Sequence, residues 1–152
     1  MSEPIQIQPA RRDDAAEISE LVRHTIRVSN SVDYPLDIIE RVASNFSKEA
    51  VLGFIANRDV WIARKDGPII GTASLDGNTV RTVFVSPAAQ GQGVGARLLE
   101  AVESAARYKG IGVLRVPDSL TAHAFYSRHS YTDLRELLHG YELTFLMENQ
   151  LV

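Results

Sequence analysis

A glycine-rich segment in the middle of the chain joins an apolar, strand-like run to a repeat of helical spacing. Its glycines are Gly91, Gly93 and Gly95, and the helical repeat begins at Val94. The first turn of a helix leaves amide groups without partners and carries partial positive charge, which attracts a phosphate by about 0.3 to 1 kcal/mol. A side chain at a glycine position would cover these amides, or would demand a rare backbone angle where φ is positive. The segment therefore predicts a loop that binds a diphosphate group.

Two other glycine-rich phosphate loops fit this segment poorly. A dinucleotide-binding unit needs GxGxxG after its first strand and an acidic residue roughly 20 residues later, whereas these glycines follow a series of hairpins. A Walker loop needs Lys and then Ser or Thr after its second glycine, and Val94 and Gly95 stand there instead. A bare GxGxG string also occurs in turns that bind nothing, so the neighbouring segments decide the interpretation.

The segment VFVSPAAQGQGVGARLL closely resembles the acetyl-CoA signature of the GCN5-related N-acetyltransferase (GNAT) family. The loop of that family reads Gln/Arg-x-x-Gly-x-Gly/Ala, and Gln90, Gly93 and Gly95 stand at its defining positions. The resemblance extends over nearly the whole chain, through IQIQPARRDD, DVWIARKDGPIIGTASL and AHAFYSRHSY. It implies an α/β (α+β) fold of a single domain, residues 1–152, with a mixed and mostly antiparallel central sheet flanked by helices.

The resemblance also implies where acetyl-CoA binds. In the family, the strand before the loop splays from its neighbour, and its free backbone groups pair with the pantetheine arm. The corresponding residues here are Val83, Phe84 and Val85. The diphosphate contacts of the family correspond to the loop that begins at Gln90 and to the backbone amides of Gly91, Gln92, Gly93, Val94, Gly95 and Ala96.

A tyrosine beyond the glycine loop is the candidate general acid. The run from Ala122 to Tyr126 matches the family pattern A-x-x-F-Y, which implies that Tyr126 protonates the departing thiolate of coenzyme A. A phenol, with a reference pKa of about 10, can donate to such a leaving group, although an aromatic ring packed beneath the cofactor would give the same pattern. Family members commonly read Gly-Phe or Gly-Tyr shortly afterwards, where this chain has Ser130 and Tyr131, so the turn there is expected to differ.

The general base that must deprotonate an amine is less clear from the sequence. Many relatives use a carboxylate on the fourth or fifth strand, directly or through water, but the run expected as the fourth strand here, TVRTVFV, has none. The remaining candidates are Glu142, Asp118, Asp76 and His123, each of a type that is more often a surface or turn residue. Glu142, on the last predicted strand, is preferred among them.

Several other residues that could take part in binding or catalysis lie in no recognisable motif. Trp61 lies within a strand-like run and is expected in the core. The family's acceptor side includes the helical region that holds His24, Asp33 and Tyr34, but a solvated helix face explains these residues equally well. No metal site is expected, because the histidines lack HExxH spacing and fall on separate predicted elements: His24, His123, His129 and His139.

The resemblance predicts an N-acetyltransferase that moves the acetyl group of acetyl-CoA directly to a primary amine, with a small molecule as the expected acceptor. Cysteine is absent, so no cysteine nucleophile can carry the acyl group in a ping-pong mechanism. Two alternatives stay open: an acetyltransferase of a protein N-terminus or lysine, and a binding module that holds an acyl-CoA without turnover. A homodimer formed through the last strand also agrees with the resemblance.

Composition limits the partners and the cellular location. The 152 residues fit one domain, with 45% hydrophobic and 23% charged residues. A net charge of -3 gives no broad attraction to nucleic acid. No apolar run approaches the roughly 20 residues that span a bilayer, and the N-terminus lacks the apolar stretch of a signal peptide. A cytoplasmic protein that binds neither nucleic acid nor membrane is therefore expected.

The periodicity of apolar residues predicts the elements that position these groups. Short alternating or apolar runs indicate strands at 5–8, 60–64, 67–75, 78–85, 113–116 and 141–147, the first of them near a sheet edge. Helical spacing indicates a helix from Asp13 or Asp14 to about Arg27, and two or three short helices that begin near Pro35 and Ser47. Further helices are expected from Val94 to a cap at Gly110, and at 121–128.

Overall fold

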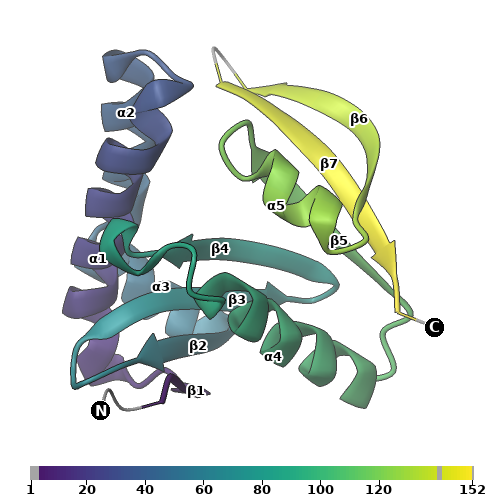
Figure 1. Ribbon diagram of the computed structural model, residues 1–152, viewed down its shortest axis with the longest axis horizontal. Helices are drawn as coiled ribbons and strands as arrows, with labels where there is room; N and C mark the ends of the chain where they lie inside the picture. Colours follow the sequence, from purple (N-terminus) through teal and green to yellow (C-terminus); the bar gives the residue numbers. More distant parts are fainter. Residues whose placement is uncertain (1–3, 140–141, 152) are drawn as a thin grey trace.

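The computed structural model describes residues 4–139 and 142–151, with the backbone alone for residues 137–139, 142 and 143. A seven-stranded sheet has the strand order β1-β2-β3-β4-β5-β7-β6 (Figure 1). Every neighbouring pair is antiparallel except β4 and β5, which confirms the expected mixed and mostly antiparallel sheet. The strands are β1 Gln6–Pro9, β2 Asp59–Arg64, β3 Ile69–Asp76, β4 Thr79–Val85, β5 Val113–Ser119, β6 Thr132–His139 and β7 Glu142–Gln150.

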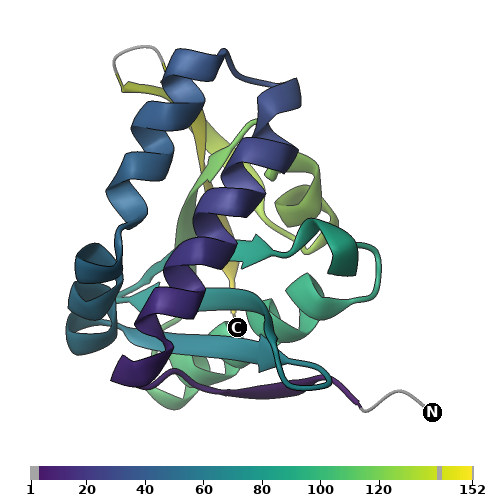
Figure 2. The ribbon, with the colours of Figure 1, turned by 90° about the vertical axis from the view of Figure 1, so that its left-hand side faces the viewer.

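Helices cover both faces of this sheet and divide the buried core in two. Ile26, Ile39 and Val51 belong to the cluster beneath the first three helices, which Figure 2 shows in front of the strands. Leu98 and Tyr126 belong to the cluster beneath the last two helices. The helices are α1 Ala15–Ser29, α2 Leu36–Ala43, α3 Lys48–Asn57, α4 Val94–Tyr108 and α5 His123–Arg128.

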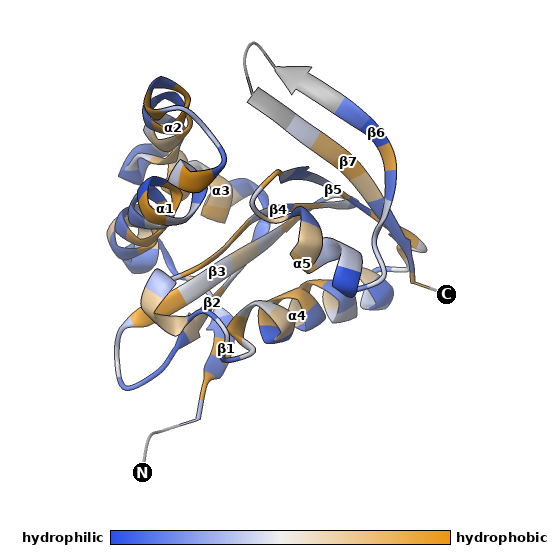
Figure 3. Cartoon of the chain, turned by 45° about the horizontal axis from the view of Figure 1, so that its top comes forward, coloured by the Kyte–Doolittle hydropathy of each residue, from blue (hydrophilic) through white to orange (hydrophobic). Residues whose placement is uncertain are grey.

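The sequence of α4 explains its position against the sheet. Leu98 and Val102 recur at helical spacing and are fully buried, whereas Glu100 on the other side is exposed. Figure 3 shows this mixture of hydrophobic and hydrophilic residues around α4. Gly110 ends the helix with φ of 78°. On β3, a Cβ at Gly71 would lie 2.8 Å from Leu98 Cδ1, so a glycine there lets the helix approach the strand closely.

The sheet opens between its two parallel strands. The ladder between β4 and β5 consists of one pair, Thr79 with Arg115, and one further hydrogen bond joins the Arg115 amide to the Asn78 carbonyl at 2.9 Å. Beyond this point the strands diverge, as the green and teal parts of Figure 1 show. The splayed strand pair expected from the family resemblance is therefore present.

Two features of the sheet differ from the sequence analysis. The strand β6 was not predicted, because the leucine spacing in TDLRELLH does not alternate as a half-buried strand requires. The last strand is also longer than expected, and it pairs with β5 on one side and β6 on the other. Strand β7 therefore has a neighbour on each side along residues 144–148, and β6 is the edge strand, while the expected homodimer stays a prediction. No helix in the described part of the chain is long and apolar enough to cross a membrane.

Candidate functional site

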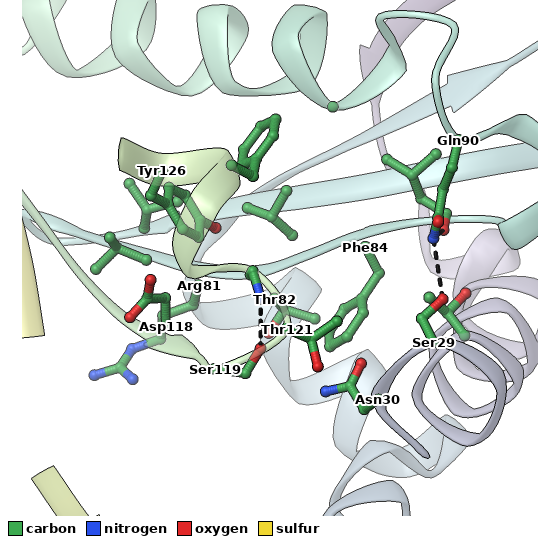
Figure 4. A pocket seen from close by; sticks show the side chains of 18 of the residues that line it. Ser29, Asn30, Arg81, Thr82, Phe84, Gln90, Asp118, Ser119, Thr121 and Tyr126 are labelled. Atoms are coloured by element: carbon green, nitrogen blue, oxygen red, sulfur yellow. Dashed lines mark hydrogen bonds between the residues drawn. The ribbon is translucent and has the colours of Figure 1, made fainter. Parts of the chain in front are cut away.

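A cavity of about 810 Å³ lies where β4 and β5 diverge. Its walls come from both sheet halves, from the end of α1, from α5 and from the loop that leads into α4. Figure 4 shows Gln90 and Ser29 on one side of it, and Asp118 and Tyr126 on the other. The splay thus brings together most of the residues that the sequence singles out.

The free edge of β4 supplies backbone groups to this cavity. Phe84 pairs with Thr72 on β3, and the Ser86 amide donates to Ile70 on the same strand at 2.8 Å. Since polar backbone groups alternate between the two edges of a strand, those of Val83 and Val85 face β5. Phe84 thus turns its backbone to β3, and its ring lines the cavity.

A bulge in β4 precedes these free groups. The register with β3 shifts between Thr72 and Ser74, so that β4 has one residue more than its partner. Within the bulge, Thr82 has φ of 55°, a region that a β-branched residue rarely adopts. Bulges of this kind bend a strand and change where its side chains point. Here the bend directs Thr82 and Val83 into the cavity wall.

The loop before α4 holds a row of backbone amides without partners. Gly91 and Gly93 have φ of 82° and 81°, so both take the left-handed conformation that favours glycine. The first hydrogen bond of the helix runs from the Arg97 amide to the Gly93 carbonyl, and no hydrogen bond from the amides of residues 91–96 is found within the described chain. The first turn of α4 has no acidic side chain. These features fit an anion such as a diphosphate.

Glycine is required at position 95 for a different reason than at positions 91 and 93. A Cβ there would lie 3.1 Å from the Phe125 ring, whereas a Cβ at Gly91 or Gly93 would meet nothing within 4 Å. Gly95 therefore lets α5 pack against the first turn of α4. Positive φ, together with the need to leave the loop amides uncovered, accounts for glycine at positions 91 and 93. Close packing against Phe125 accounts for glycine at position 95.

Gln90 links the glycine loop to α1 across the cavity mouth. Its Nε2 donates to Ser29 Oγ and to the Val85 carbonyl, both at 3.1 Å, and Figure 4 shows the first of these bonds. The carbonyl that it occupies belongs to the free edge of β4. A ligand that donates to the Val85 carbonyl would therefore share this acceptor with the Gln90 side chain or displace it.

Tyr126 lies on α5 against the β5 side of the cavity. Only 4% of its surface is exposed, and its ring packs edge to face against Phe125 and Tyr131. Its hydroxyl makes no hydrogen bond to the described residues, and Tyr126 lines the cavity. Burial, with a further contribution from the charge of Asp118, raises the pKa of Tyr126 far above its usual range. The phenol therefore keeps its proton at every working pH.

Asp118 is the most unusual charged group in the cavity wall. It is 3% exposed, and neither carboxylate oxygen has a hydrogen bond within the described chain. Burial raises the pKa of Asp118 to about 6, although His123 and nearby backbone amides partly oppose this effect. An unpaired buried carboxylate is costly, and such groups concentrate at functional sites.

The other base candidates of the sequence analysis have different surroundings. Glu142 begins β7 opposite His139, and its side chain lies outside the described residues. Asp76 accepts from Arg81 at 3.1 Å, and His123 contacts Asp133 at 2.7 Å. Neither Asp76 nor His123 lines the cavity. Asp118 is thus the base candidate whose carboxylate the structure places in the cavity wall.

Two residues of the predicted acceptor region connect the sheet halves. The Tyr34 hydroxyl accepts from the Leu120 amide at 2.8 Å, and Asp33 accepts from Thr121 Oγ1 at 2.7 Å. These bonds tie the α1–α2 connection to the loop after β5, whose residue Thr121 lines the cavity. His24 is exposed on α1.

Trp61 packs against the core cluster as expected. Within the described residues, no group of three potential ligands is placed to hold a metal ion.

Sequence reasoning missed one aromatic part of the cavity wall. Phe46, Phe54 and Arg58 line it together with the Phe84 ring. None of them belongs to a motif, and Arg58 stands in the sequence as an ordinary charged residue before a strand. Only their shared position around the bulge of β4 identifies them.

Comparisons with known proteins agree with this geometry. A structure of a GCN5-related N-acetyltransferase from Rhodopseudomonas palustris has a TM-score of 0.91 and 22% identity, over 99% of this chain and 98% of that one. The PaiA N-acetyltransferase of Thermoplasma acidophilum, solved in complex with coenzyme A, has a TM-score of 0.83 and 22% identity, over 97% of this chain and 99% of that one.

A third solved structure is yncA from Salmonella typhimurium with its cofactor acetyl-CoA. It has a TM-score of 0.65 and 23% identity, over 99% of this chain and 95% of that one. At these identities the solved structures establish the fold alone. No curated protein is similar enough in sequence to count as a match. The family model of the acetyltransferase (GNAT) domain matches residues 56–133, just over half of the 152 residues. The chain therefore belongs to the GNAT family of acetyltransferases.

Proposed function

We propose that this protein transfers the acetyl group of acetyl-CoA directly to the primary amine of a small molecule. The observation that carries the proposal is the single cavity that joins the free amides before α4 to Asp118 and Tyr126. The solved structures of PaiA with coenzyme A and of yncA with acetyl-CoA, which share this fold, support the choice of donor. In this proposal, the amides of residues 91–96 bind the diphosphate, and the free edge formed by Val83 and Val85 pairs with the pantetheine arm.

Different residues of the cavity then carry out different parts of the transfer. As the amine nitrogen attacks the thioester carbon, an N–C bond forms and the C–S bond breaks. The bound ammonium loses one proton to solvent before it attacks as the neutral amine, and Asp118 accepts the second proton as the amide forms. A pKa of about 6 makes this carboxylate a stronger base than an ordinary one. A backbone amide on the free edge of β4 polarises the carbonyl oxygen. Asp118 later returns its proton to solvent.

Tyr126 acts on the leaving sulfur. Because burial raises its pKa so far, complete transfer of its proton to a thiolate is unfavourable. A hydrogen bond from the phenol to the developing negative charge has no such cost. We therefore assign Tyr126 as a hydrogen-bond donor to the departing thiolate.

Replacing Tyr126 by phenylalanine should lower kcat without changing the affinity for acetyl-CoA. A hydrogen bond to a charged group contributes about 1.5 to 3 kcal/mol, so the expected loss is roughly 10- to 100-fold. Steady-state assays and a binding titration measure the two quantities. Tyr108→Phe is the matched control, because that side chain is 93% exposed. An unchanged kcat in Tyr126→Phe would show that the hydroxyl does not act in catalysis and that the ring only packs in the core.

The function itself is tested by two measurements on the purified protein. Calorimetric titration with acetyl-CoA should give saturable binding. Release of free thiol should then follow when amines are added, with small amines, amino acids, diamines and short peptides as acceptors. Binding without thiol release from any acceptor would favour a non-catalytic acyl-CoA module. Efficient release with peptides alone would move the acceptor to a protein N-terminus or lysine.

A further inference from the structure

The charges around the cavity are unevenly distributed. Its lining includes three arginines, Arg58, Arg81 and Arg128, and, among the described side chains, one carboxylate, that of Asp118. Asp76, just behind the wall, interacts through one oxygen with both Arg81 at 3.1 Å and Arg58 at 3.8 Å. One carboxylate thus faces two guanidinium groups, and the wall on the β4 side keeps an excess positive charge.

Arg58 is the least exposed of these three arginines. It follows α3 directly, and its guanidinium lies 3.9 Å from the centre of the Phe54 ring. Its Nη1 donates to Thr82 Oγ1, within the bulge of β4, at a long 3.4 Å. The side chain is 16% exposed, and burial lowers the pKa of Arg58. A guanidinium carries five N–H donors, so most of them remain available to a ligand.

An aromatic surface lies beside this positive group. The Phe46 ring packs edge to face against Phe54 at 6.1 Å and against Phe84 at 5.9 Å. All three residues line the cavity, together with Val42. The cavity therefore has a positive group and an apolar wall on the β4 side, and an unpaired carboxylate on β5.

We propose that the acceptor is a small zwitterion, a primary amine that also carries a carboxylate, and that Arg58 binds this carboxylate. The proposal rests on the proposed transfer to an amine. The ammonium end then lies toward Asp118, the carboxylate pairs with Arg58 in the fork geometry that guanidinium groups favour, and the carbon skeleton contacts the phenylalanine rings. A polyamine fits this distribution poorly, because it would bring several positive charges to a cavity whose described side chains include three arginines and one carboxylate.

The test compares acceptors that differ only in the carboxylate. Amino acids with aromatic and aliphatic side chains are paired with their amides, such as L-phenylalanine with L-phenylalaninamide, and 1,4-diaminobutane represents the polycations. Thiol release from acetyl-CoA gives kcat/KM for each. For Arg58→Gln, the ratio of acid to amide should fall by roughly 10- to 100-fold relative to wild type, the effect of a hydrogen bond to a charged group. Arg58→Lys should recover part of the ratio, since it keeps the charge without the fork.

Controls separate this role from damage to the fold or to the donor site. Arg107→Gln removes an exposed arginine that does not line the cavity, and it should leave the ratio near the wild-type value. The affinity for acetyl-CoA should be the same in all variants. A measurement without any variant uses 3-phenylpropanoate, which should inhibit competitively with the amine, whereas 3-phenylpropanamide should not.

The outcomes distinguish the two proposals. Thiol release with amides or diamines at least as efficient as with amino acids, together with no inhibition by the carboxylate, overturns the zwitterion proposal alone. An equal loss for acid and amide in Arg58→Gln also overturns it. Release from no amine of any charge, by protein that binds acetyl-CoA, overturns the proposed transfer and this inference with it.

Discussion

Replacing Asp118 by asparagine is expected to lower kcat by about 10²- to 10⁴-fold, the usual contribution of a positioned general base. The affinity for acetyl-CoA should not change, because the loop before α4 is a separate part of the cavity. Rates of thiol release and calorimetric titration measure these two quantities. Asp37→Asn, on the exposed first turn of α2, is the matched control. A large loss in Glu142→Gln with a small loss in Asp118→Asn would assign the base to Glu142 instead.

The same carboxylate should govern the pH dependence of activity. Asp118 must be ionised to accept a proton, and burial places its pKa at about 6. We therefore expect kcat/KM of the wild type to fall as the pH drops below about 6, with an acidic limb near that value. The Asn variant should lack this limb in its residual activity. An unchanged limb in the variant would assign it to another group.

Ionisation of Asp118 should raise the activity of the protein but lower its stability. The pKa rises from 3.8 in the unfolded chain to about 6 in the folded protein, so between these values the folded state binds more protons. The contribution of Asp118 to the free energy of unfolding is fully present below pH 3.8, and it decreases as the pH rises to about 6 and above. Above about pH 6, Asp118→Asn should therefore be more stable than wild type by roughly 1 to 3 kcal/mol, and near pH 4 nearly equal to it. Chemical denaturation at the two pH values tests this, and a less stable variant at neutral pH would contradict it.

Replacing Gly93 by valine is expected to weaken acetyl-CoA binding by at least about 100-fold. The residue has φ of 81° at the start of α4, and a β-branched side chain disfavours that conformation. As the loop shifts, the amides lose their common direction, and the loss of two hydrogen bonds to a charged group, at about 1.5 kcal/mol each, accounts for the factor. Calorimetric titration gives the affinity.

Gly110 provides a control with nearly the same backbone conformation. It has φ of 78° after the other end of α4, and a Cβ at either glycine would meet nothing within 4 Å. Gly110→Val should therefore cost a similar free energy of unfolding while binding remains normal. Equal weakening by both substitutions would attribute the effect to strain in α4 rather than to the loop.

The sequence predicts the parts of the site that depend on local conformation. The glycine loop, the helix after it and Tyr126 are all recognisable, because each has a pattern of neighbours in the chain. The sequence does not distinguish Asp118 from Asp76, since both follow apolar runs and only the fold buries one and pairs the other. It likewise treats Gly95 as equivalent to Gly93, although a ring from a distant helix explains the former.

The fold was predictable to a similar degree. Strands with clear alternation and helices with clear caps appear close to their expected positions. Strand β6 escaped prediction because its leucines do not follow the alternation of a strand, and its place at the edge depends on β7. Which strand lies at the edge of the sheet likewise depended on a neighbour that the sequence did not reveal. Long-range pairing, rather than local preference, decides these elements.

The single pair that joins β4 to β5 divides the sheet into two hydrogen-bonded units. Strands β1 to β4 form the first unit, and β5, β7 and β6 form the second. Few backbone hydrogen bonds must break for them to separate locally, so the amides at this seam should exchange with deuterium faster than those inside either unit. A ligand that pairs with Val83 and Val85 while its diphosphate rests on α4 acts as a missing strand. Slower exchange on both sides of the seam should then accompany saturation with the ligand.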